Sequence, residues 1–240
     1  MAATELLFRA DPYLRTVAAT VVAAGAEGIV LDRSVFYAAG GGQPGDSGHL
    51  ERGDGATIAV TTAVYGPDRA AVLHVPVEGA VLPAPGERLV VHLDWARRYA
   101  HMRMHTALHL LSAVLPFPVT GGQIGADEGR LDFDIPDGGL DKDEVTERLN
   151  ALIAGDHAVT TEWITDDELL ANPGLVKTMS VKPPMGSGRV RLVRIGSVDL
   201  QPCGGTHVAA TGEIGRAEVA KIEKKGRQNR RVRIVLAEPA

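Results

Sequence analysis

The sequence predicts an α+β protein in which a small antiparallel β-barrel, residues 1–92, precedes a two-layer α+β domain, residues 93–240. The first part contains short β-rich segments separated by glycine- and proline-rich turns. At Asp94 the composition changes, and a long stretch with apolar residues near helical spacing follows. Beyond it, helical and strand-like segments interleave without a regular βαβ repeat, which favours a mixed or antiparallel sheet.

Length and composition indicate a globular chain. It has 240 residues, of which 45% are hydrophobic and 23% charged, so it can bury a sizeable core. No apolar run approaches the roughly 18 residues that a membrane span requires, and acidic residues stand where a signal peptide would be basic and then apolar. We therefore expect a cytoplasmic protein without a membrane partner, and the sequence favours a monomer.

Four segments of the first part are typical of barrel strands, and three turn clusters separate them. The strands are expected at residues 28–37, 56–65, 70–77 and 87–94, and the turns at 40–48, 52–55 and 82–86.

A long helix is expected over residues 95–115. Asp94 is placed to cap its N-terminus, and Pro116 and Pro118 end it, because proline cannot donate to a helical ladder. A second helix is predicted at 142–154, where Asp141 and Glu144 resemble a capping box. The remaining elements expected are strands at 130–135, 159–164, 190–195 and 231–236 and a short helix at 166–171.

Two spaced pairs of residues carry the chemistry of metal binding. His105 and His109 stand four apart in the predicted helix, which puts both imidazoles on one face. Cys203 and His207 are also four apart, across two glycines that allow the chain to fold tightly. Together they make a thiolate and imidazole set of the kind that Zn²⁺ prefers.

Each pair also has a plainer interpretation. A His-x3-His pair on a helix is often incidental, and the lone cysteine is equally compatible with a buried free thiol. A nucleophilic Cys203 activated by His207 or His105 is a third interpretation, which we rank lower because a dyad does not need four ligands. Thr106 stands where zinc proteases of the HExxH type carry glutamate, so that mechanism does not apply. Asp199 is a candidate to accept a hydrogen bond from a ligand imidazole, or else a surface acid at a strand end.

Two glycine-rich stretches complete the candidates. The stretch at 38–48 has neither the dinucleotide fingerprint nor a phosphate-binding loop, so nucleotide binding is not expected; it forms barrel turns or packs against the following domain, and we favour the second. Its motif residues are Gly40, Gly41, Gly42, Gln43, Gly45 and Asp46. Gln123 lies in the other stretch, which we expect to be a flexible turn after the helix, where its amide can orient a substrate or water; the alternative is a hairpin turn without such a role.

Charge is divided unevenly along the chain. Residues 1–176 have 12 Lys and Arg against 25 Asp and Glu, whereas residues 177–240 have 13 against 5. Such asymmetry suggests a polyanionic partner, and the basic run lacks aromatic residues, which favours phosphate contacts over base stacking. A solvated charged surface is the alternative. The run contains Lys221, Lys224, Lys225, Arg227, Arg230, Arg231 and Arg233.

With the motifs HTALHLL and VDLQPCGGTHV and the basic tail in view, the chain resembles the alanyl-tRNA editing family, the free-standing relatives of the editing domain of alanyl-tRNA synthetase. The stretch FYAAGGGQPGDSG is similar to the glycine-rich motif of the longer members, so the resemblance covers nearly the whole chain.

The resemblance implies a hydrolase that removes serine, and sometimes glycine, from alanine tRNA and spares alanine. It implies one zinc ion held by His105, His109, Cys203 and His207, and a pocket near Thr106 and Gln123 that takes the aminoacyl group. The acceptor stem and the aminoacylated 3′ end of tRNA(Ala) are then the partners. Because no free general base lies in either motif, we expect zinc to orient the aminoacyl group while water is activated otherwise, for instance by the terminal ribose hydroxyl.

Two functions of other classes stay open at the level of the sequence. One is a non-catalytic RNA-binding module whose zinc only stabilises the fold. The other is a zinc hydrolase acting on a small ester or amide, which would be indifferent to the basic tail.

Overall fold

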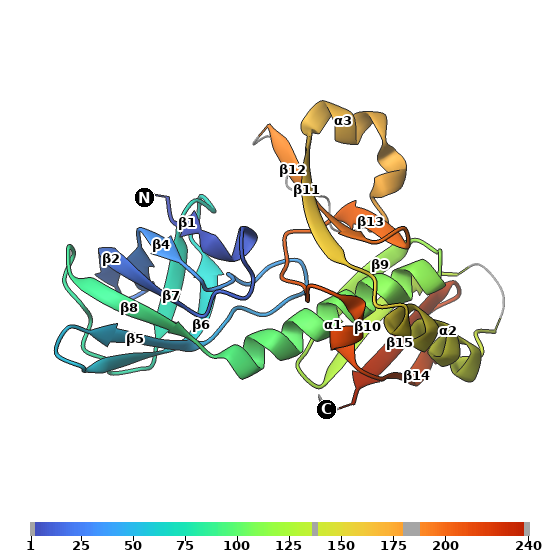
Figure 1. The fold of residues 1–240 in the computed structure, drawn as a ribbon, viewed down its shortest axis with the longest axis horizontal. Coiled ribbons are helices and arrows are strands. Elements are labelled where there is room, and N and C mark those ends of the chain that lie inside the picture. The colour runs from blue at the N-terminus through green and yellow to red at the C-terminus, as the bar shows by residue number, and fades with distance from the viewer. Residues whose placement is uncertain (1–2, 136–138, 180–187, 238–240) are drawn as a thin grey trace. The chain divides into compact units, whose positions relative to one another are not determined.

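A computed structural model of the chain describes residues 3–135, 139–179 and 188–237, and these divide into two compact units (Figure 1). The first unit ends at Tyr99 and the second begins at Ala100. The combination of a closed antiparallel barrel, further sheets and helices confirms the predicted α+β class. Among the described residues no helix is long and apolar enough to cross a membrane.

The first unit is a closed six-stranded barrel in the order β2-β3-β7-β6-β5-β8, and all its strand pairs are antiparallel. A short parallel pair, β1 with β4, and a 3₁₀ helix at Leu7–Arg9 accompany it. The strands are β1 (Glu5–Leu6), β2 (Thr16–Gly25), β3 (Gly28–Leu31), β4 (Arg33–Ser34), β5 (Gly48–Arg52), β6 (Thr57–Tyr65), β7 (Val72–Pro76) and β8 (Arg88–Leu93).

The sequence predicts the barrel but misses two of its strands. β2 consists mainly of alanine, valine and threonine, and β5 has a single fully buried residue, Leu50, so neither shows the strong alternation that marks a strand. The expected strand 28–37 is also shorter, because β4 leaves the barrel to pair with β1.

The described residues of the second unit form two antiparallel sheets and three helices. A four-stranded sheet has the order β14-β15-β10-β9, and a three-stranded sheet has the order β11-β12-β13. Its elements are α1 (Trp95–Val114, from residue 100 on), β9 (Val119–Ile124), β10 (Glu128–Asp134), α2 (Lys142–Ala154), β11 (Val159–Thr165), α3 (Asp166–Ala171), β12 (Arg189–Ile195), β13 (Asp199–Pro202), β14 (Ala217–Lys224), β15 (Asn229–Leu236) and 3₁₀ turns at Pro173–Leu175 and Thr211–Ile214.

The predicted helices are confirmed; Asp94 and Asp141 cap the first two as expected, but the Glu144 side chain pairs with Arg148 and does not complete a capping box. The Asp94 carboxylate accepts the backbone N–H of Arg97 at the start of α1, which ends before Pro116. The Asp141 carboxylate accepts the N–H groups of Asp143 and Glu144 at the start of α2. Since side chains of this kind satisfy otherwise unpaired N–H groups, the local sequence is enough to fix where these helices begin.

Two parts of the four-stranded sheet differ from expectation. Gln123 lies in strand β9 rather than in a flexible turn, and the basic run forms the hairpin β14–β15 instead of a single strand at its end. β9 accepts two glycines, Gly121 and Gly122, because the side chain of Leu131 on the neighbouring strand lies over Gly122. A Cβ at Gly122 would be 3.0 Å from Leu131 Cδ2. β9 and the strands of the hairpin form because of their pairing partners, which the local sequence does not reveal.

Candidate metal centre

His105 and His109 project from the buried stretch of α1. Residues 101–112 of this helix are all buried, and the two histidines are 7% and 6% exposed. Ordinarily such a helix would present only apolar groups. The two histidines therefore need partners for their ring nitrogens inside the second unit.

Cys203 and His207 lie on the irregular segment that follows β13. The Cys203 N–H donates to the Arg191 carbonyl, and the Arg191 guanidinium donates back to the carbonyls of Cys203 and Gly205 at 2.9 and 3.0 Å. The N–H of Gly205 points to the Cys203 sulfur at 3.4 Å. β12 thus holds the turn that aims the sulfur and the His207 ring at α1.

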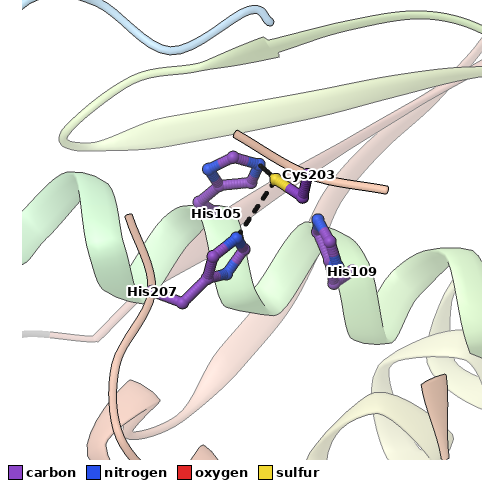
Figure 2. A group of neighbouring side chains, drawn as sticks. All are labelled: His105, His109, Cys203 and His207. Carbon is purple, nitrogen blue, oxygen red and sulfur yellow. Dashed lines mark hydrogen bonds between the residues drawn. The ribbon is translucent and has the colours of Figure 1, made fainter. Parts of the chain in front are cut away.

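The four side chains converge on one point (Figure 2). The Cys203 Sγ lies 3.4 Å from His105 Nε2 and 3.3 Å from His207 Nε2, and the four ligand atoms are within 4.8 Å of one another. In a tetrahedral zinc site with bonds of about 2.0–2.3 Å, sulfur and nitrogen ligands are separated by about 3.6 Å. The cluster therefore has the donor set and nearly the spacing that a zinc ion requires.

Outer contacts orient two of the imidazoles. His109 Nδ1 donates to Asp199 Oδ2 at 3.1 Å, which leaves Nε2 as the ligand atom. The Thr106 hydroxyl donates to the Met102 carbonyl at 2.9 Å and lies 3.1 Å from His207 Nδ1. Because the hydroxyl has one hydrogen, His207 Nδ1–H is the donor in that second contact, and its Nε2 likewise faces the cluster.

Asp199 belongs to a small buried network. Its Oδ1 pairs with the Lys177 ammonium, and its Oδ2 also accepts from the Gln201 amide at 2.8 Å. The Gln201 amide reaches Ser112 Oγ at 3.2 Å as well. The Asp199 side chain is fully shielded from solvent, so its charge is balanced by Lys177 and by the dipoles around it.

Electrostatics favour a thiolate in the cluster. Burial alone would raise the pKa of the Cys203 thiol, but electrostatic attraction to His105 and hydrogen bonds with His105 and His109 hold that pKa well below its usual value. Burial and the neighbouring His105 lower the pKa of His207 to about 3, so its ring is neutral. Burial would also lower the pKa of His109, yet hydrogen bonds to Asp199 and Cys203 raise it to about 9. For Asp199, the opposing effect of burial is outweighed by His109 and Lys177, which lower its pKa to about 2.

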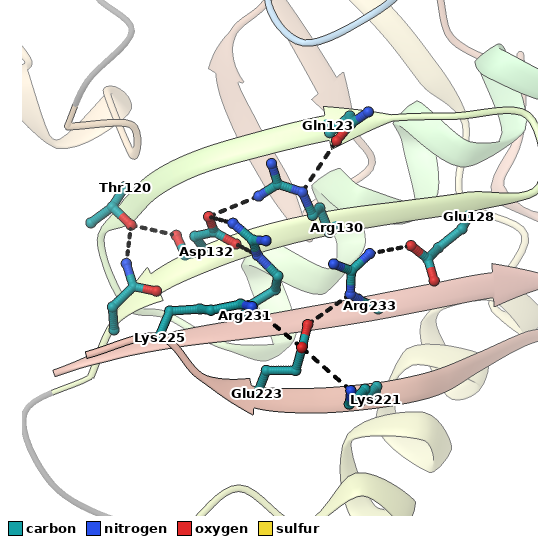
Figure 3. Close-up of polar contacts among 11 residues, drawn as sticks. Thr120, Gln123, Glu128, Arg130, Asp132, Lys221, Glu223, Lys225, Arg231 and Arg233 are labelled. Carbon is teal, nitrogen blue, oxygen red and sulfur yellow. Dashed lines mark hydrogen bonds and ion pairs between the residues drawn. The ribbon is translucent and has the colours of Figure 1, made fainter. Parts of the chain in front are cut away.

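The two predicted pocket residues differ in location. Thr106 is completely buried beside the cluster, and besides Met102 and His207 its hydroxyl accepts the Val208 N–H at 3.3 Å. Gln123 is exposed on β9, and its Oε1 accepts from Arg130 Nε at 3.3 Å (Figure 3).

The basic hairpin β14–β15 forms part of a charged sheet face in which cations and anions alternate (Figure 3). Arg231 makes a bidentate ion pair with Asp132, at 2.8 Å for both bonds, and Arg233 pairs with Glu223 and Glu128. Lys221 and Lys225 each lie 3.4 Å from Glu223.

The remaining cations of the hairpin are at its turn. Arg230 donates to backbone carbonyls nearby, whereas Lys224 and Arg227 are exposed and have no ion-pair partner within the described part of the chain. The free positive charge of this hairpin is therefore concentrated at its turn.

The glycine-rich stretch has a structural role within the first unit. Asp46 is fully buried, accepts the Tyr37 N–H and forms an ion pair with Arg98. A Cβ at Gly45 would lie 2.0 Å from the Ala63 carbonyl oxygen, so only glycine fits there. Gly41 and Gly42 have φ of 57° and 84°, and Gly40 and Gln43 bridge across them. The motif is a tight turn sealed by a buried salt bridge.

Three residues around the cluster were not predicted from the sequence. Lys177, Gln201 and Arg191 are of types common at any surface, and each reaches the site from a separate segment of the second unit. Only the position of Gln201, two residues before Cys203 and on the same strand as Asp199, hinted at a supporting contact.

Comparisons with known proteins identify relatives of this chain. Residues 190–233 match the family model of the threonyl and alanyl tRNA synthetase second additional domain. The alanyl-tRNA editing protein AlaX-M of Methanosarcina acetivorans is 36% identical over 97% of this chain and 99% of its own length. AlaX-L of Pyrococcus horikoshii is 34% identical over 93% of this chain and 55% of its own length. An alanine–tRNA ligase of Pyrobaculum aerophilum is 33% identical over 92% of this chain, which corresponds to 25% of the ligase.

The likeness to AlaX-M extends over both chains almost from end to end and includes the segments that carry the four clustered side chains. We conclude that the chain belongs to the family of alanyl-tRNA editing proteins.

Proposed function

We propose that the protein is a trans-editing hydrolase that deacylates serine-charged alanine tRNA, and also the glycine-charged form, while it spares correctly charged Ala-tRNA(Ala). The observation that carries this proposal is the end-to-end likeness to proteins named for alanyl-tRNA editing, in a chain that gathers three buried histidines and a half-buried cysteine around one point. In this proposal residues 93–240 are the editing domain, residues 1–92 are a barrel appended to it, and a monomer acts in the cytoplasm, where its tRNA substrate is charged.

The cluster is proposed to hold one zinc ion through His105, His109, Cys203 and His207. The ligand types, the spacing of sulfur and nitrogen atoms and the low pKa of the Cys203 thiol support this assignment. When bound, the ion supplies a fixed positive charge against which the aminoacyl ester can be oriented.

The surrounding residues fix which ring atoms face that ion. Asp199 keeps the Nδ1 proton on His109, and Thr106 does the same for His207. With its hydroxyl hydrogen given to Met102, Thr106 is best described as a positioning residue on His207. Its direct contact with the amino acid, together with that of Gln123, stays a prediction; a hydrogen bond to the serine hydroxyl would select serine over alanine more sharply than an apolar wall excludes a methylene.

The tRNA is proposed to lie against the basic hairpin, with phosphates of the acceptor stem near Lys221, Lys224, Lys225, Arg227, Arg230 and Arg231. The exposed turn with its unpaired Lys224 and Arg227 supports a phosphate contact there, since the described residues offer these two cations no acidic partner. Arg231 and Lys221 would have to exchange acidic partners for phosphate, so we expect them to contribute less.

The decisive experiment measures hydrolysis of seryl-, glycyl- and alanyl-tRNA(Ala) by the purified protein, with its metal content determined on the same sample and with Cys203→Ala alongside. We expect rapid release of serine, no loss of alanine, one zinc in the cluster of the parent protein, and loss of both zinc there and activity in the variant. Salt-sensitive tRNA binding without deacylation would instead support the RNA-binding module. Turnover of small esters at a rate that does not change when the cations of the hairpin are neutralised would support the small-molecule hydrolase.

A further inference from the structure

A second group of ligand-type side chains lies on the barrel, in the first unit. His49 and Glu51 are on β5 and His92 is on β8, and the strands alternate so that Leu50 and Val91 point into the core. The three polar side chains are consequently on the outer face of the barrel. His49 and His92 are direct partners in the antiparallel β5–β8 ladder.

The three side chains are as close as ligands of one ion. Their donor atoms lie within 4.8 Å of one another, and the two imidazoles stack with a centroid distance of 4.5 Å and an interplanar angle of 8°. The Nε2 atom of His92 is 2.8 Å from Glu51 Oε2. Two bonds of about 2.1 Å at right angles would place such atoms about 3.0 Å apart.

The polar atoms of this group are not accounted for by ordinary contacts. His92 Nε2 is buried, yet it has no hydrogen-bond partner within the described residues, so its close approach to the Glu51 carboxylate lacks the direction of a hydrogen bond. Nor does any lysine or arginine pair with Glu51 in that same part of the chain. A buried ring nitrogen and a carboxylate that face each other without a hydrogen bond are a pair that a cation between them would satisfy.

We propose that His49, Glu51 and His92 form a second metal site, which binds a divalent transition ion such as Zn²⁺, Co²⁺ or Ni²⁺ through two imidazole nitrogens and one carboxylate. Two histidines with one carboxylate are an established donor set for these ions, and the half-exposed position leaves the remaining coordination sites to water. The ion would link the neighbouring strands β5 and β8 on the outer face of the barrel. This site contains no sulfur and is independent of the editing reaction.

The test uses the absence of sulfur to tell the two sites apart. The metal-free full-length protein is titrated with Co²⁺, and the visible and near-ultraviolet spectra are followed. Binding at Cys203 gives an intense thiolate-to-cobalt charge-transfer band, whereas binding at the barrel adds only weak d–d bands. We expect both signals in the parent protein, as two separable classes of site.

Variants assign the second signal. His92→Ala and His49→Ala should each abolish the sulfur-free class and leave the charge-transfer band unchanged, and Glu51→Gln should weaken the sulfur-free class roughly ten-fold or more. Glu78→Gln is the matched control, because Glu78 is an exposed acid in the turn after β7. In Cys203→Ala loaded with zinc, X-ray absorption should show nitrogen and oxygen neighbours only.

Two results would overturn the proposal. The first is a parent protein that binds cobalt only with the charge-transfer signal. The second is a sulfur-free class that survives unchanged in both His92→Ala and Glu51→Gln. Since the three side chains are on the surface, the thermal midpoint of each metal-free variant serves to show that the barrel is folded.

Discussion

At the level of single residues, Thr106 has two candidate roles: it positions the His207 ring, or it contacts the amino acid of the substrate. Its hydroxyl contacts Met102, His207 and Val208, all within the protein. A residue with these contacts acts on the substrate only by orienting the His207 ring. A residue of the amino acid pocket would instead touch the substrate itself.

Replacing Thr106 by valine keeps the shape of the side chain but removes the acceptor for His207 Nδ1–H. We expect Thr106→Val to bind zinc about 10-fold to 100-fold more weakly, because groups that orient a ligand imidazole have effects of this size. Thr106→Ser keeps the hydroxyl and should bind zinc as the parent protein does. Competition with a chromophoric chelator measures both affinities. Unchanged zinc affinity in Thr106→Val, with lost discrimination between serine and alanine, would assign Thr106 to the amino acid pocket instead.

The residues of the metal centre differ in how well they could be predicted from the sequence. Two pairs with a spacing of four anticipated that His105, His109, Cys203 and His207 lie together, since helix geometry and a glycine turn are local properties. Lys177 and Arg191 support the centre from other segments and have ordinary residue types, so only the folded chain reveals them.

Among the elements, strand β7 of the barrel carries a buried histidine that makes stability depend on pH. His74 Nδ1 donates to the Ile29 carbonyl at 2.9 Å, so its Nε2 accepts from the Ser34 hydroxyl at 2.7 Å. Burial lowers the pKa of His74 to about 4, although the Ile29 contact acts in the other direction. The ring is therefore neutral in the folded barrel.

Between pH 6.5 and pH 4 the unfolded chain takes up a proton at His74 that the folded barrel excludes. The free energy of unfolding should then fall as the pH is lowered through this range, by up to about 3 kcal/mol. We expect His74→Gln to be less stable at neutral pH but to lose less stability on acidification. Thermal midpoints recorded from pH 7 to pH 4 test this. Parallel pH profiles for the two proteins would mean that another group is responsible.

The hairpin β14–β15 leads to a prediction about salt. Lys224 and Arg227 have no acidic partners among the described residues, so we expect Lys224→Ala with Arg227→Ala to weaken tRNA binding. The slope of log affinity against log salt should become shallower by about 1 for each phosphate that the double variant leaves without a cation. Lys142→Ala with Arg148→Ala on α2 removes the same charge and should leave the slope unchanged. Equal slopes for both double variants and the parent would place the tRNA elsewhere.

Helices and strands also differed in how well they could be predicted. The starts of α1 and α2 follow from Asp94 and Asp141, whose carboxylates cap the helices through nearby backbone groups. By contrast β2, β9 and β14 are rich in small, glycine or charged residues, and they are strands because a neighbouring strand offers its backbone.

On the scale of the whole molecule, the division into two units predicts that damage to the metal centre remains local. Cys203→Ala removes one ligand from the second unit, and the barrel has its own core and its own buried salt bridge between Asp46 and Arg98. We expect faster amide hydrogen exchange in β13 and in α1 around His105 and His109, with unchanged exchange in the barrel strands. Exchange that rises equally throughout would show that the two units unfold as one.

The excess of cations counted along the sequence is not all free positive charge in the folded chain. The C-terminal quarter has an excess of cations, but the sheet face around β15 pairs much of it with Asp132, Glu223 and Glu128. A count of charges along the chain therefore overstates the free positive surface, and the position of the excess could only be found in three dimensions.

The pairing of His105 with Cys203, 98 residues apart in the chain, bears on how the protein is made. A ribosome releases the α1 histidines long before the cysteine, and two imidazoles on one helix offer only half of the donor atoms. An ion at this cluster would be captured with full affinity only after His207 has been synthesised and β13 has docked beside α1. A chain that stops before Cys203 would therefore carry both helix histidines and still have no competent site.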